Sequence, residues 1–138
     1  MSASPTNHEK EYMRRMSLIF LCITLFSGLF SAVYEHFSHD VYSNFMVYLF
    51  MFPLVGGVIP YAILGLTPRT RCPSRVATRL YNSGVATLSV GSCVKGVLDI
   101  YGTTSVYMPV YWVAGIILAT IGLAMYIIGY GSKRKAEA

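Results

Sequence analysis

The chain has 138 residues, of which 54% are apolar, 14% aromatic and only 12% charged. Water-soluble domains carry about 25% charged residues, so this composition excludes an ordinary cytosolic enzyme, and it also excludes a disordered chain, which would be polar and highly charged. Three cysteines are too few for a secreted disulfide scaffold, which leaves an integral membrane protein of one domain's length.

Four apolar stretches follow one another along the chain, at residues 16–34, 45–66, 80–101 and 111–130. Each approaches or exceeds the roughly 18 residues that a transmembrane helix needs. The connections between them are short, so neighbouring helices should be antiparallel. We therefore expect an all-α fold, with four transmembrane helices in an up-down bundle over residues 16–131. Short tails should precede and follow it, at residues 1–15 and 132–138, and their outermost residues should be mobile.

The placement of the cations predicts the orientation. Ten of the eleven lie before the first stretch, in the connection 67–79 or after the fourth stretch, namely Lys10, Arg14, Arg15, Arg69, Arg71, Arg75, Arg79, Lys133, Arg134 and Lys135. The connections 35–44 and 102–110 contain no lysine or arginine. The positive-inside rule then places both termini in the cytoplasm of a multi-pass cell-membrane protein. The lack of long tails or further domains favours a bacterial cytoplasmic membrane. We attribute the net charge of +5 to the cations that determine the topology and that attract anionic lipid headgroups, and not to a nucleic-acid-binding surface.

Two features describe how the helices should pack. Proline and glycine cluster at the centre of the second stretch, which predicts a kink there: Pro53, Gly56, Gly57 and Pro60. Small residues recur at helical spacing in the other stretches, as in Gly115, Ala119, Gly122, Tyr126 and Gly129, and in Gly84, Thr87, Gly91 and Lys95. Such stripes favour close helix contacts, within the chain or with a second copy or partner subunit, and the alternative is a path for a polar solute. Tyrosine, tryptophan and phenylalanine flank the two cation-free connections, as expected at a membrane interface.

The two halves of the chain resemble each other weakly. A shift of 64 residues places Arg15 over Arg79, Glu35 over Asp99 and Phe37 over Tyr101. Either a hairpin has been duplicated, leaving one carboxylate per half near the outer rim, or apolar segments with interfacial aromatics match by chance.

Three ionisable residues are candidates for a binding site. Lys95 lies about six residues, or about 9 Å, inside the end of the third stretch. Ionisable residues at such depth in a membrane are candidates for a functional role. Asp99 is four residues further on, within reach on the same helix face. The lysine either extends toward the interface and pairs with Asp99, or it also meets Glu35 across the bundle.

The first outer connection could supply metal ligands. His36, His39 and Asp40 lie close together in sequence, but two histidines and a carboxylate in one turn are a weak signal without a distant third ligand. Solvated interfacial side chains are the simpler interpretation, and no cofactor is strongly implied.

These observations favour a non-enzymatic membrane protein, either a homo-oligomer or a subunit of a membrane complex, which binds or moves an ion or small solute at Glu35, Lys95 and Asp99. The alternative is a membrane oxidoreductase or cofactor-binding subunit that uses the histidines of the outer connection.

Overall fold

The computed structural model of the protein describes residues 5–39, 41–67 and 73–137. Every regular element within these ranges is helical: α1 (Pro5–Phe37), α2 (Asn44–Val47), α3 (Met51–Pro53), the π-helical turn η1 (Leu54–Val58), α4 (Ile59–Leu66), α5 (Arg75–Ile100) and α6 (Met108–Glu137). The protein is therefore all-α.

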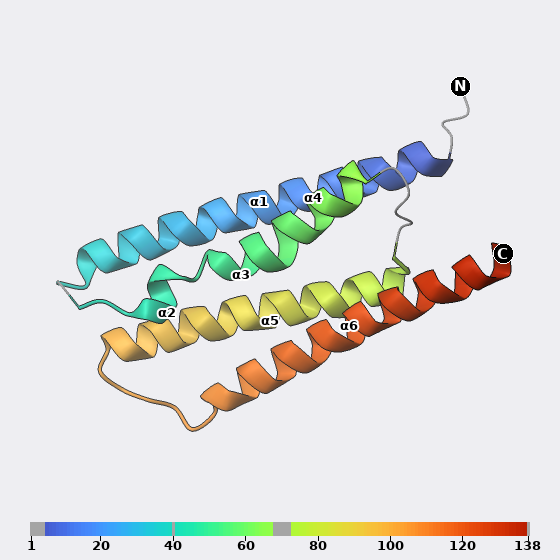
Figure 1. Ribbon diagram of the computed structural model, residues 1–138. Helices are drawn as coiled ribbons and strands as arrows, with labels where there is room; N and C mark the ends of the chain where they lie inside the picture. Colours follow the sequence, from blue (N-terminus) through green and yellow to red (C-terminus); the bar gives the residue numbers. More distant parts are fainter. Residues whose placement is uncertain (1–4, 40, 68–72, 138) are drawn as a thin grey trace.

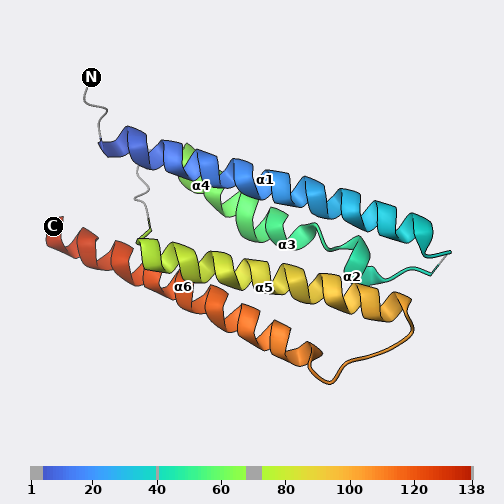
Figure 2. The same cartoon turned by 180° about the vertical axis from the view of Figure 1, so that it is seen from behind.

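The helices lie side by side in an open row (Figure 1). Among the described elements, α1 contacts the segment from α2 to α4, α5 contacts that segment on its other side, and the backbone of α6 approaches α5 alone. The Trp112 ring of α6 also packs beside Phe45 and Phe52, with ring centroids 5.9 and 5.7 Å apart. Neighbours along the row are antiparallel, so α1 begins and α6 ends at one end of the molecule, as Figure 2 shows from behind. We call this the inner end, and the opposite end, with the connections 38–43 and 101–107, the outer end.

Both terminal helices extend into the predicted tails. Helix α1 begins at Pro5 and α6 continues to Glu137, so most of residues 1–15 and 132–138 within the described ranges is helical. Extending an existing helix costs far less than nucleating a new one, and no proline or glycine interrupts the chain between Thr6 and Arg15. Lys10, Arg14 and Arg15 therefore project from a helix.

Helix α5 has well-defined signals at both ends. Ser74 caps its first turn by accepting a hydrogen bond from the amide of Ala77 at 3.2 Å, so the helix begins five residues before the predicted Leu80. At the other end Gly102 adopts φ +70°, which glycine does without strain. The amide of Thr103 then donates to the carbonyl of Leu98 at 2.9 Å, the bond of a Schellman motif.

The second apolar stretch is discontinuous. It consists of the single turn α2, a short α3, the π-helical η1 and α4, so the predicted interruption near Pro53 is present. Proline removes an amide donor and crowds the preceding turn, and a π-turn is a common way to absorb such a defect. The packing is close here, because a Cβ added at Gly57 would lie 2.1 Å from the ring of Phe20. Phe20 also stacks on Tyr61, with ring centroids 5.7 Å apart.

Small residues join α5 to α6 along one seam. A Cβ added at Gly84 would lie 2.4 Å from the amide nitrogen of Ala119, and one added at Gly122 would lie 2.5 Å from that of Tyr81. The predicted stripe of small residues on α6 is thus a contact surface for α5 as far as Gly122. For Gly129, further along the same stripe, no atom of the described residues lies within 4 Å of such a Cβ.

Two helices in the described part of the chain are long and apolar enough to cross a membrane, over Asn7–Phe37 and Met108–Ser132. Only 22% and 11% of the residues in their most apolar windows are buried. Leu25, Phe26 and Leu29 of α1, for example, are each about two-thirds exposed. The helical segment Met51–Leu66 is also apolar but shorter.

Candidate functional site

The predicted site residues lie around α2 at the outer end. This single helical turn is held by serine hydroxyls from both neighbouring helices. Ser31 of α1 donates to the carbonyl of Met46, and Ser92 of α5 donates to the carbonyl of Phe45, each at 2.7 Å. An interrupted helix leaves backbone carbonyls that must be satisfied within the protein if lipid surrounds it. Ser92 supplies a donor to Phe45, whereas the Met46 carbonyl accepts both from Ser31 and from the Leu49 amide at 3.2 Å. Together the two serines fix α2 between α1 and α5.

Lys95 and Asp99 form an ion pair on α5, as their spacing of four residues predicts. The Ser43 hydroxyl, at the start of α2, donates to Asp99 Oδ2 at 3.1 Å. The Lys95 ammonium also lies 5.6 Å from the centroid of the Phe45 ring, within the range of a cation–π contact. The side chains of Lys95 and Asp99 are 24% and 28% exposed. The pair therefore ties α5 to α2 in a half-buried setting.

Glu35 lies on the other side of α2. It follows Ser31 by one helical turn, at the end of the α1 face that carries the buried Thr24, Ser27 and Ser31. No ion pair links Glu35 to Lys95 in the described structure. Its Oε1 is buried and has no hydrogen-bond partner among the described residues, whereas most buried polar atoms have one. The structure thus brings Lys95 and Asp99 together and leaves Glu35 as a separate, incompletely satisfied carboxylate.

The histidines of the outer connection project outward. His36 and His39 are exposed, and His39 adopts φ +54° where the chain leaves α1. Within the described ranges no three histidine, cysteine or acidic side chains are grouped so that they could hold a metal ion. Asp40 lies outside those ranges, so the metal site remains a prediction from sequence.

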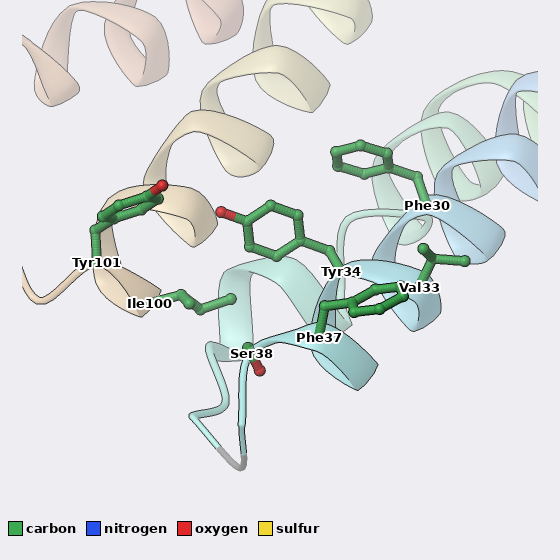
Figure 3. A pocket seen from close by; sticks show the side chains of 7 residues that line it. All are labelled: Phe30, Val33, Tyr34, Phe37, Ser38, Ile100 and Tyr101. Atoms are coloured by element: carbon green, nitrogen blue, oxygen red, sulfur yellow. The ribbon is translucent and has the colours of Figure 1, made fainter.

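A groove of about 370 Å³ lies between the outer ends of α1 and α5. Its lining is mainly aromatic and aliphatic, and the hydroxyls of Tyr34 and Tyr101 face each other across it (Figure 3). Sequence analysis identified these tyrosines as interfacial aromatics and not as groove residues. Glu35, Lys95 and Asp99 are not part of the lining, so the groove and the ionisable residues are distinct features of the outer end.

No protein-family model, curated protein or solved structure matches the chain. Its function therefore has to be argued from the geometry of these residues.

Proposed function

We propose that the chain is a non-enzymatic integral membrane protein that crosses the bilayer four times, with both termini in the cytoplasm. The observation that carries this proposal is the apolar surface of α1 and α6, where large side chains such as Phe26 and Ile128 are 68% and 70% exposed. Proteins in water rarely expose contiguous apolar patches beyond a few hundred Å². Lipid chains would cover this surface without cost.

Helix α5 fits the proposal although it is more polar than α1 and α6. Its 26 residues are about 39 Å long, enough for a hydrocarbon core of about 30 Å. Several of its small and polar residues are buried against neighbours, among them Thr78, Gly84 and Ser92. A crossing helix in the interior of the row needs less apolar surface than one that faces lipid. The discontinuous segment from α2 to α4, fixed by serine hydroxyls, would be the remaining crossing.

We further propose that the outer end binds a small cation, and that the buried Oε1 of Glu35 is its ligand. A carboxylate oxygen without a donor is costly in a medium of low dielectric, and a cation or a proton offsets that cost. The Lys95–Asp99 pair, on the far side of α2, would fix the geometry of the turn. Because α6 packs on α5 and, through Trp112, on Phe45 and Phe52, only its remaining faces are available to contact a second copy or a partner membrane subunit.

Reporter fusions test the topology. A fluorescent protein that matures only in the cytoplasm should be active when fused after Ala138. A phosphatase that folds only outside the cytoplasm should be active when inserted after Thr104, in the outer connection. The reverse pattern, or activity of both reporters at both positions, would contradict four crossings with cytoplasmic termini.

A thermal-stability titration tests the cation site. The melting temperature of the purified protein should rise with added sodium or potassium chloride relative to N-methylglucamine chloride at equal ionic strength. Glu35→Gln should abolish this rise. Glu11→Gln, which neutralises an exposed carboxylate of the same helix at the inner end, should preserve it. An equal response in both variants would contradict the assignment to Glu35, and a stoichiometric metal or a visible absorption band would indicate a cofactor-binding protein instead.

A further inference from the structure

A second groove opens at the inner end, between the first turns of α1 and the last turns of α4. Its volume is about 760 Å³, twice that of the outer groove. Lys10, Glu11, Arg14 and Arg15 are among its lining residues. The two helices approach closely beside it, because a Cβ added at Gly65 would lie 3.6 Å from Met13 Cβ.

The charge of this inner groove changes along the axis of α1. Three cations and one carboxylate are part of its lining, and the three cationic side chains are exposed. Lys10, Arg14 and Leu18 succeed one another at steps of four residues, so they lie on one face of α1. Arg14 and Leu18 are about 6 Å apart along the helix axis. The wall therefore turns from cationic to apolar within one helical turn.

The α4 side of the inner groove adds apolar surface. Ala62 and Leu66 line it. The Leu66 side chain is 84% exposed, and leaving apolar surface in contact with water is unfavourable. An inorganic anion would make no favourable contact with this apolar surface. An amphiphile, with a charged head and a hydrocarbon chain, matches both parts.

We propose that the inner groove binds one anionic phospholipid of the cytoplasmic leaflet. Its phosphate would contact Arg14, Arg15 and Lys10, because guanidinium groups donate two parallel hydrogen bonds to phosphate oxygens, and its acyl chain would lie along Leu18 and Leu66. This inference rests on the proposed membrane topology, which puts the groove at the depth of the headgroups.

Native mass spectrometry of the full chain in mild detergent tests the proposal, with phosphatidylglycerol and phosphatidylcholine as the probes. The wild type should retain one phosphatidylglycerol at least tenfold more readily than phosphatidylcholine. Arg14→Gln with Arg15→Gln should weaken that retention by about fivefold to thirtyfold, as expected for two cations at the headgroup level. The matched control is Arg75→Gln with Arg79→Gln, which removes the same charge from exposed positions of α5 at the same end, and it should stay within about twofold of the wild type.

A second variant distinguishes binding of the acyl chain from binding of the headgroup. Leu18→Gln with Leu66→Gln keeps every cation but removes the apolar wall, so it should lose phosphatidylglycerol severalfold. Millimolar glycerol phosphate or inorganic phosphate should not displace the lipid from the wild type. Circular dichroism and gel filtration identify any variant that fails to fold, and in that case the single substitutions Arg14→Gln and Leu18→Gln are compared instead.

Three results would overturn the inference: equal losses in the two arginine variants, displacement by free phosphate, or no preference for phosphatidylglycerol. These outcomes are distinct from failure of the proposed function. If the reporter fusions place both termini in the cytoplasm and lipid selectivity is still absent, the inner groove alone has been misassigned.

Discussion

Replacing Gly84 by alanine should weaken the contact between α5 and α6. The new Cβ would lie 2.4 Å from the amide nitrogen and 2.8 Å from the Cα of Ala119, where ordinary contacts begin at 3.4 Å. Both atoms belong to backbone, so no side-chain rotation relieves the clash and α6 has to move away by about 1 Å. Overpacking of this kind costs about 1–3 kcal/mol, and a gap of that size also forfeits part of the dispersion energy along the seam. We expect the free energy of unfolding to fall by about 2 kcal/mol, or Tm by about 5–8 °C.

Thermal unfolding in detergent micelles, followed by circular dichroism, measures this loss. Gly129→Ala is the matched control, since it adds the same methyl group to α6 where no atom lies within 4 Å, and surface changes of this kind stay within about 0.5 kcal/mol. Gly122→Ala adds a methyl group to the same seam from the opposite helix, 2.5 Å from the Tyr81 nitrogen. Its Tm should fall by about as much as that of Gly84→Ala. If Gly84→Ala melts within about 1 °C of Gly129→Ala, the two helices do not pack through this seam.

Two further experiments test the polar contacts at the outer end. Ser92→Ala removes the buried hydroxyl that donates to Phe45 O at 2.7 Å and should lower the free energy of unfolding by about 1 kcal/mol. Thr120→Ala, which removes an exposed hydroxyl bonded within its own helix, should change it by less than about 0.5 kcal/mol, and equal effects would contradict a special role for Ser92. A double-mutant cycle with Lys95→Met and Asp99→Asn should give a coupling energy of about 0.5–1 kcal/mol in chemical denaturation. That coupling should shrink at high salt, and a value near zero would show that the ion pair contributes nothing to stability.

The sequence predicted the features that depend on local spacing. Glycine and alanine at steps of three and four on α6 indicated a packing stripe, and Ala119 and Gly122 do meet α5 along it. The pairing of Lys95 with Asp99 follows from helical geometry alone. The interruption near Pro53 follows from the missing amide donor of proline. In each case the cause lies within a few residues of its effect.

Features that depend on distant partners were not predictable in this way. No charge, glycine or proline between Asn44 and Phe52 signals that the helix stops after Val47. The turn is stabilised by hydroxyls 15 and 47 residues away in the sequence. The contact of Lys95 with the Phe45 ring depends on the same placement of α2. Likewise, periodicity does not reveal that the Gly129 end of the stripe is left without a neighbour.

The position of α2 also explains why one predicted cluster became two sites. Within the described ranges the backbones of α1 and α5 do not approach each other, and each approaches the segment between them. Ser31 binds α2 from one side and Ser92 from the other, and among the described residues no ion pair joins Glu35, one turn beyond Ser31, to Lys95. The missing amide of Pro53 frees the carbonyl of Leu49, four residues earlier, and not those of Phe45 and Met46, so the serines act on a different break from the one predicted near Pro53. The break after Val47, which no proline or glycine marks, is what leaves α2 as a separate turn that both serines reach.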